Sequence, residues 1–150
     1  MILLQEWGYY GLFFGSFLAS TVVPFSSEFL LTGVLLTGGN PWICFALATS
    51  GNWLGSVSSY WLGFFGKWEF IEKLLRVKRE KLEKQKSRIE KWGSIIALVC
   101  WLPFIGDIFA IGLGFYHINF GKSALFMLIG KALRFIFFIL IWFFLSERFN

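Results

Sequence analysis

Charged residues are scarce in this chain of 150 residues, and they are unevenly distributed. Only 15% of the residues are charged, whereas 57% are hydrophobic and 21% are aromatic, and the mean hydropathy is +0.67. Segment 67–91 contains ten of the fourteen Lys and Arg residues and five of the nine Asp and Glu residues. This composition excludes a water-soluble globular domain, because almost everything outside that segment can enter lipid.

Residues and motifs that carry the chemistry of soluble enzymes are also lacking. The two cysteines, Cys44 and Cys100, lie alone in apolar runs, which argues against a disulfide framework or a metal cluster. No zinc-protease, nucleophile-elbow, phosphate-loop, dinucleotide-binding or nucleic-acid motif occurs in the chain. We therefore expect no enzymatic activity, no metal, no cofactor and no nucleic-acid partner.

What the chain does contain is two long apolar runs that are each broken by a proline and an acid. Pro24 precedes Glu28 in the first run and Pro103 precedes Asp107 in the second. Proline removes a backbone donor, and a carboxylate at membrane depth is costly. Each run is therefore predicted to form two half-helices with a buried break, and the two prolines mark the tips of the resulting hairpins.

A longer stretch follows each broken run: residues 42–65 are uncharged, and residues 122–145 are mainly apolar but carry Lys131 and Arg134 well inside. Both exceed the length of about 20 residues that spans a bilayer, so each predicts a transmembrane helix. The apolar run over 7–22 is either a half-helix or a short full crossing, and these alternatives place the N-terminus on opposite sides. No basic residue precedes this run, so we expect mature structure rather than a removable signal peptide.

The two halves of the chain repeat one another with an offset of 79 residues and no gap. The matching pairs are Pro24 and Pro103, Glu28 and Asp107, Gly33 and Gly112, Asn40 and Asn119, and Gly51 and Gly130. Each unit has one crossing, so the second unit is inverted relative to the first. The sequence therefore predicts an all-α integral membrane protein built as an inverted repeat of a re-entrant hairpin plus a transmembrane helix, which is a transporter architecture.

The whole chain, residues 1–150, is predicted to be a single membrane domain. Repeat 1 covers about 7–66 and repeat 2 about 92–146, with a charged amphipathic helix over about 67–91 between them. That helix is either solvated, as in a short coiled coil, or lies on an anionic lipid surface. Its excess of basic residues places it in the cytoplasm.

Four charged residues inside the apolar runs are the candidate functional residues. Glu28 and Asp107 are either a proton-titrating pair at the hairpin tips or helix caps that accept from free N–H groups. Lys131 and Arg134 lie three residues apart and so share one helix face. They either bind a lipid phosphate or form structural ion pairs with the two acids.

Small and polar residues on the first long helix form a second candidate group. Asn52 matches Lys131 by the offset of 79, and is either a cavity residue or an interhelical hydrogen-bonding residue. The glycine ladder consists of Gly51, Gly55, Ser59 and Gly63, and its spacing favours close helix packing. The short chain encloses little volume, so we expect a homodimer that uses this ladder as its contact.

Five motifs, at residues 24–28, 51–55, 60–63, 102–107 and 130–134, together resemble the DedA family of SNARE-associated or VTT domain proteins, and within it the short YqaA-like branch. The resemblance covers nearly the whole chain. It implies facing re-entrant hairpins, a multi-pass location in the bacterial inner membrane and a role in moving lipids. By the same resemblance, Glu28 matches the family's acid after the first proline motif, while Ser56 stands where a second acid often occurs.

These observations lead us to expect an inner-membrane lipid transporter of the flippase or scramblase type. Its substrate would be a phospholipid or a polyprenyl phosphate, it would support envelope homeostasis, and proton coupling stays open. A proton-coupled exporter of a small solute or cation is the first alternative, since it uses the same acids without a phosphate site. A non-transporting membrane scaffold, whose charged helix recruits partners, is the second.

Overall fold

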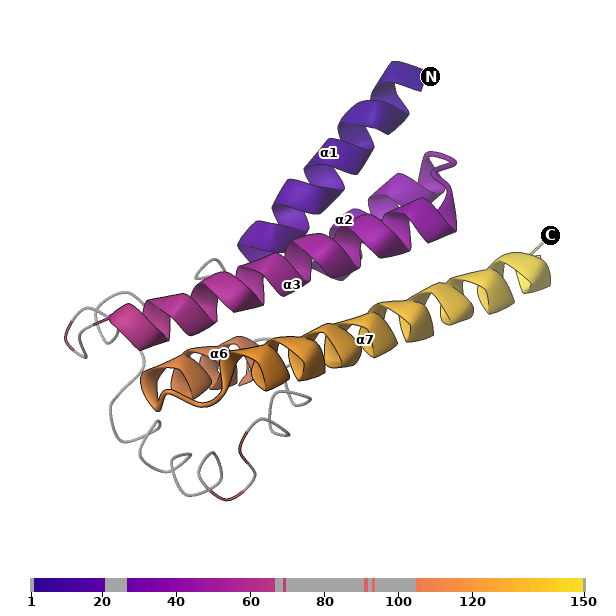
Figure 1. Ribbon diagram of the computed structural model, residues 1–150. Helices are drawn as coiled ribbons and strands as arrows, with labels where there is room; N and C mark the ends of the chain where they lie inside the picture. The colour runs from indigo at the N-terminus through magenta and orange to yellow at the C-terminus, as the bar shows by residue number, and fades with distance from the viewer. Residues whose placement is uncertain are drawn as a thin grey trace.

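The structure, a computed structural model, describes residues 2–20, 27–66 and 105–149, together with the single residues Glu69, Lys91 and Gly93. The described residues form five α-helices (Figure 1): α1 (Ile2–Ala19), α2 (Ser27–Leu36), α3 (Pro41–Phe65), α6 (Ile105–Phe115) and α7 (Phe120–Phe149). Pro24, Pro103, the side chain of Asp107 and nearly all of segment 67–91 lie outside the described residues. The prediction of an all-helical fold is confirmed for the described part of the chain.

Helices α3 and α7 start in the same way, at positions related by the offset of 79. Asn40 caps α3, and its Oδ1 accepts hydrogen bonds from the backbone N–H groups of Trp42 at 2.9 Å and Ile43 at 3.4 Å. Asn119 Oδ1 accepts one from the N–H of Lys122 at 3.0 Å. These caps satisfy N–H groups that have no partner inside the helix, which explains why both helices begin directly after an asparagine.

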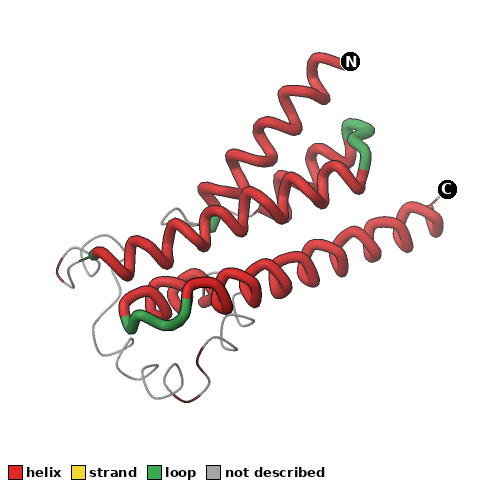
Figure 2. The backbone as a smooth tube through the Cα atoms, viewed as in Figure 1, coloured by secondary structure: helices red, strands yellow, loops and turns green. Residues whose placement is uncertain are grey.

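The short helices α2 and α6 also match by that offset, so the described chain contains two helical hairpins, α2–α3 and α6–α7. The turns of the two hairpins, drawn green in Figure 2, lie at opposite ends of the molecule. Accordingly α3 and α7 run side by side in opposite directions. Trp42 near the start of α3 contacts Phe143 near the end of α7, whereas Tyr60 Oη near the end of α3 donates to the carbonyl of Ile118 just before α7.

Helix α1 lies along α2 and α3 and begins at the end of the molecule that carries the α2–α3 turn. Gln5 Nε2 donates to the carbonyl of Thr37 at 3.2 Å, and the N–H of Asn40 donates to Tyr9 Oη at 2.9 Å. The other end of α1 stops beside α3, where Ser20 Oγ lies 2.8 Å from Ser56 Oγ. Residues 9–20 therefore reach from the start of α3 to Ser56 and Ser59, in the second half of that helix.

The glycine ladder brings backbones into direct contact within the chain. A Cβ added to Gly51 would clash with the carbonyl oxygen of Phe13 in α1, and one added to Gly55 would lie 2.5 Å from the Phe17 oxygen. Gly63 contacts the carbonyl of Ile111 in α6 in the same manner. We predicted that a second copy would cover this ladder, and the structure corrects that assignment, because α1 and α6 of the same chain bury it.

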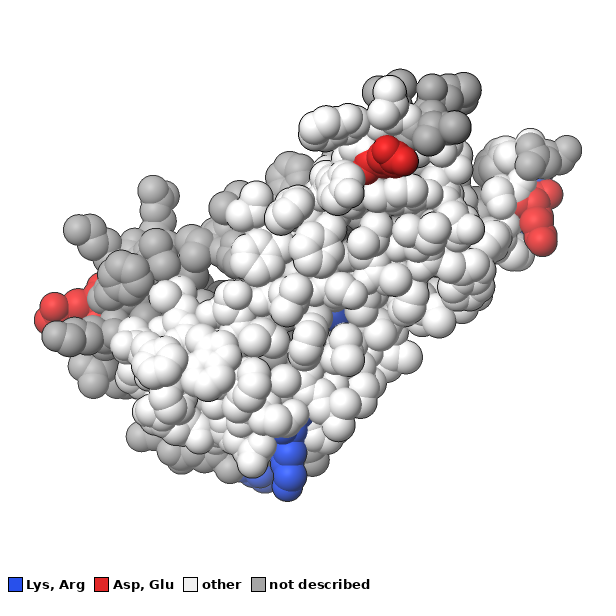
Figure 3. Space-filling model, turned by 45° about the horizontal axis from the view of Figure 1, so that its top comes forward, with Lys and Arg blue, Asp and Glu red and all other residues white. Residues whose placement is uncertain are grey.

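Apolar side chains cover most of the outer surface of the described helices. Large hydrophobic residues with exposed fractions of 40–60% follow the outer face of α7, including Leu125, Ile129, Leu133, Phe137 and Leu140. On the face drawn in Figure 3, charged side chains gather near the ends of the molecule, with one small blue area between them. An apolar middle with charged ends is the surface that a protein presents to a bilayer.

Among the described helices, α7 is long and apolar enough to cross a membrane, with a mean hydropathy of 2.3 in its most apolar window. Helix α3 has 25 residues, so its predicted helical character over 42–65 is confirmed. The most apolar window of α3 has a lower mean hydropathy than that of α7, because small and polar residues that pack against α1, α6 and α7 occur throughout α3. That α3 also crosses the bilayer stays a prediction.

Candidate functional site

A cluster of buried polar side chains lies where α1, α3 and α7 meet, and we call it the polar centre. It consists of Ser20, Asn52, Ser56 and Lys131, whose exposed fractions are all 2% or less. Lys131 Nζ donates to Ser20 Oγ at 2.8 Å and to Asn52 Oδ1. Ser20 Oγ in turn lies 2.8 Å from Ser56 Oγ, so one hydrogen-bonded network joins three helices.

The ammonium of Lys131 is stabilised by the end of α1 as well as by side chains. Asn52 Nδ2 donates to the carbonyl of Ser16 at 3.1 Å, and Ser59 Oγ donates to the carbonyl of Ser20 at 3.2 Å. The last carbonyls of a helix carry a partial negative charge, so the end of α1 favours a cation beside it. Burial of an unpaired charge is very costly, and the hydrogen bonds to Ser20 Oγ and Asn52 Oδ1 offset part of that cost.

Asn52 and Lys131 are equivalent residues of the two repeats, since 79 positions separate them, and they contact each other directly. The contact joins α3 of the α2–α3 hairpin to α7 of the α6–α7 hairpin. The offset of 79 had indicated that the two residues match, and the structure adds that their side chains are hydrogen-bonded to each other.

An ion pair on the neighbouring turn of α7 joins that helix to α2. Arg134 Nε lies 2.9 Å from Glu28 Oε1, and Arg134 Nη2 donates to Ser27 Oγ at 3.0 Å. The side chains of Arg134 and Glu28 are 14% and 27% exposed, so the pair is reachable from outside, unlike Lys131. Glu28 also lies in the first turn of α2, where the helix dipole favours a carboxylate.

Aromatic side chains mark both ends of the α3–α7 pair, and the polar centre lies between them. Trp42 packs on Phe143 at one end, with ring centroids 6.4 Å apart, and Trp61 packs on Phe120 at the other, at 4.8 Å. Asn52 is almost equidistant in sequence from the two tryptophans. At 1.5 Å per residue the tryptophans are about 28 Å apart along α3, close to the hydrocarbon thickness of about 30 Å.

The structure brings four of the predicted site residues together: Glu28, Asn52, Lys131 and Arg134. It leaves Asp107 untested, because only the backbone of this residue, in α6, is described. Ser20 was not predicted, and Ser56 was noted only as a departure from the family pattern. A signal for Ser56 exists in its position one turn after Asn52, whereas Ser20 becomes recognisable only once the end of α1 is placed.

The polar centre and the neighbouring ion pair bring two cations, an amide and several hydroxyls close together. In the part of the chain that the structure describes, no three His, Cys, Asp or Glu side chains converge on a point that could hold a metal ion. Arginine presents a planar fork that matches a phosphate, and lysine adds a compact charge. In the structure, the acceptors of both cations come from the chain itself.

Helices with a lipid-exposed surface and a buried charged centre define a helical integral membrane protein. The VTT domain matches residues 23–144 of the chain. Inner membrane protein YqaA of Escherichia coli K12 is 34% identical over 128 residues, which cover 85% of each chain. The chain therefore belongs to the VTT-domain, or DedA, family, and its predicted location in the inner membrane is confirmed.

Other relatives extend the comparison beyond that protein. An uncharacterized protein of Haemophilus influenzae is 30% identical over 135 residues, covering 83% of this chain and 81% of its own. The uncharacterized protein MJ0201 of Methanocaldococcus jannaschii is 24% identical over 137 residues, covering 88% of this chain and 82% of its own. No solved structure matches the chain at a significant level.

Proposed function

We propose that the protein moves lipids with a phosphate headgroup across the inner membrane, as a flippase or scramblase. The observation that carries this proposal is the position of Lys131, an ammonium at 1% exposure midway between the aromatic ends of the molecule. Charged residues at such a depth are costly, and they commonly mark the path of a polar substrate. A lipid headgroup is the polar group that has to pass this depth during translocation.

The inverted repeat of re-entrant hairpins is part of this proposal, and three features support it. The α2–α3 and α6–α7 turns lie at opposite ends, and α3 is antiparallel to α7. Helix α1 enters beside the α2–α3 turn and ends next to Ser20, which bonds to Ser56 and Ser59 before α3 itself ends at Phe65. The two ends of the α1–α2 hairpin then lie on one side of the membrane.

The chemistry at the site follows from its charges. Arg134 provides the fork that a phosphate binds, and Glu28 occupies that fork in the resting protein. An incoming phosphate would displace the carboxylate, and a proton on Glu28 would weaken its hold on the guanidinium. Lys131 and Asn52 would receive the headgroup one turn deeper, and the acyl chains would stay in lipid. Phospholipids and polyprenyl phosphates share this headgroup chemistry.

Lipid translocation in proteoliposomes tests the proposal, with fluorescent phosphatidylglycerol and a labelled polyprenyl phosphate as substrates. We expect Arg134→Gln and Lys131→Met to slow movement by about tenfold or more, since a hydrogen bond to a charged group contributes about 1.5–3 kcal/mol. Ser58→Ala, a change on the exposed face of α3, serves as the matched control and should retain the wild-type rate.

The swapped variant Glu28→Arg with Arg134→Glu separates a binding role from a structural one. The swap retains an ion pair between α2 and α7 but moves the cation away from Lys131. We expect a folded protein that does not translocate lipid. Full activity in the swapped variant, or no lipid movement by the wild type, would overturn the proposal. A response to a proton gradient that requires an added solute would indicate an exporter instead.

A further inference from the structure

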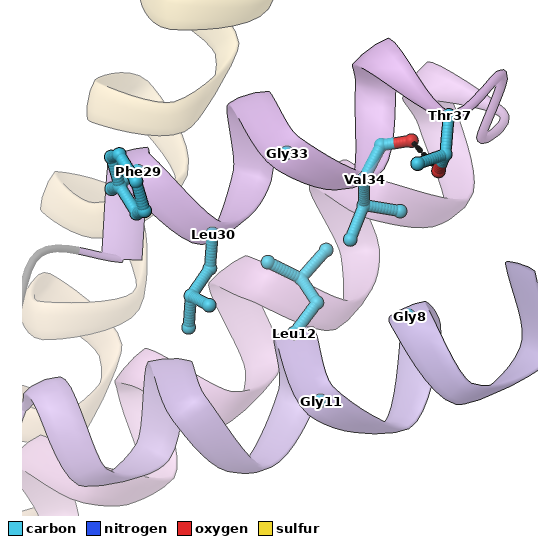
Figure 4. Close-up of a pocket in the computed structure, with 8 residues that line it drawn as sticks. All are labelled: Gly8, Gly11, Leu12, Phe29, Leu30, Gly33, Val34 and Thr37. Atoms are coloured by element: carbon cyan, nitrogen blue, oxygen red, sulfur yellow. Dashed lines mark hydrogen bonds between the residues drawn. The ribbon is translucent and has the colours of Figure 1, made fainter. Parts of the chain in front are cut away.

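A groove of about 270 Å³ lies between α1 and α2, away from the polar centre. The residues that line it belong to these two helices, except for Thr37 directly after α2, and Figure 4 shows Leu12, Leu30 and Val34 pointing into the space between the ribbons. Neither α3 nor α7 contributes to the lining, so the groove opens toward the outside of the molecule. The proposed transport site makes no use of it.

The groove is closed at both ends and open between them, because the two helices touch at two places. Val34 packs against Gly8, where an added Cβ would lie 3.4 Å from its side chain, and Leu30 packs against Gly15. Between these contacts, a Cβ added to Gly11 or Gly33 would meet nothing within 4 Å. The open stretch from Gly8 to Gly15 is about 10 Å long at 1.5 Å per residue.

Water and a second protein helix fit this groove poorly. The lining offers a single hydroxyl, that of Thr37, and this group already donates to the carbonyl of Val34 at 2.8 Å. A buried water needs two to four polar partners, which the groove does not provide. A helix with side chains is about 10–12 Å wide and cannot enter between helices that touch at both ends of the opening.

An alkyl chain fits both the size and the surroundings. A methylene occupies about the same volume as a water molecule, about 30 Å³, so the volume of the groove corresponds to about nine methylenes. Its rim is continuous with the lipid-exposed surface, where Phe29 is 76%, Tyr10 65% and Phe14 60% exposed. We infer that this groove binds one acyl chain of a membrane lipid, held between α1 and α2. This site is distinct from the headgroup path proposed above.

Photolabelling tests the site without measuring transport. The protein is reconstituted in vesicles of phosphatidylethanolamine and phosphatidylglycerol that contain a trace of phospholipid with a diazirine in the middle of one acyl chain. After irradiation, mass spectrometry locates the labelled residues. We expect labelling of 8–12 and 29–34 to exceed, by several-fold, labelling of the equally lipid-exposed residues Leu133 and Phe137 on α7.

Filling the groove provides the decisive comparison. Gly11→Leu and Gly33→Leu place a side chain in space that is open in the structure, so folding is retained while labelling of α1 and α2 falls several-fold. Labelling of α7 should not change, and Ser58→Leu on the exposed face of α3 is the matched control. Equal labelling of α1–α2 and α7, no response to filling, or cross-links between two protein copies at these positions would overturn the inference.

Discussion

The contact between Asn52 and Lys131 leads to a quantitative prediction about stability. In Asn52→Leu, Lys131 Nζ loses one acceptor and the Ser16 carbonyl loses its donor. A buried polar group left without its partner costs about 1–3 kcal/mol, so two such losses predict a free energy of unfolding lower by about 2–6 kcal/mol. Adding Lys131→Met to Asn52→Leu removes the ammonium that has lost its acceptor, so the double variant should recover part of the lost free energy of unfolding.

A double-mutant cycle measures the coupling between these two residues. Hydrogen bonds between membrane helices average about 0.6 kcal/mol and reach about 1.7 kcal/mol, and a charged donor at 1% exposure belongs at the upper end of that range. We therefore expect a coupling energy of about 1.5 kcal/mol. Cys44, whose exposed fraction is 0%, reports unfolding through its maleimide reactivity during an SDS titration in a Cys100→Ser background.

A control cycle pairs Asn52→Leu with Asn119→Ala. Asn119 lies in the turn between α6 and α7, at the end of the molecule far from Asn52. Distant substitutions add within about 0.5 kcal/mol, so this pair should show no coupling. The reasoning is refuted if Asn52 and Lys131 are also additive, or if Asn52→Leu leaves the free energy of unfolding unchanged. Either result would mean that the bond between the two repeats contributes nothing to stability.

Three further predictions use the same titration. Gly114→Ala pushes a methyl group onto the carbonyl of Tyr60 and should lower the free energy of unfolding by about 1–3 kcal/mol. Gly11→Ala meets open space in the groove and should raise it by up to about 1 kcal/mol, because alanine is the better helix former; a loss of stability would contradict the open groove. Asn40→Ala and Asn119→Ala each remove a helix cap and should cost about 1 kcal/mol, and no change in either variant would mean that the cap bonds are not formed.

The helices could be predicted from the sequence because each is encoded locally. The asparagine before α3 and the one before α7 set where those helices begin, and the offset between Asn40 and Asn119 revealed the second hairpin from the first. The spacing of the glycine ladder predicted close packing but not the partner. Spacing shows that a helix face permits close approach, whereas the identity of the neighbour depends on the tertiary arrangement.

The site was only partly predictable for the same reason. A charge inside an apolar run is visible in the sequence, so Glu28, Lys131 and Arg134 were identified. Which charge meets which partner depends on the register between helices, and a shift of one turn would have paired Glu28 with Lys131 instead of Arg134. Ser20 contributes through the end of α1, and a serine at a helix end carries no sign in the sequence that it accepts from a lysine 111 residues later.

The buried lysine of α7 also bears on how the protein is made. Lys131 and Arg134 at the centre of a spanning helix together oppose insertion by the translocon by roughly 5–7 kcal/mol on the biological scale. Their partners Ser20, Glu28 and Asn52 precede α7 in the chain, so they are synthesised first. The acceptors for both cations are thus made before the helix whose charges they offset, so the order of the chain is compatible with inserting α7 beside them.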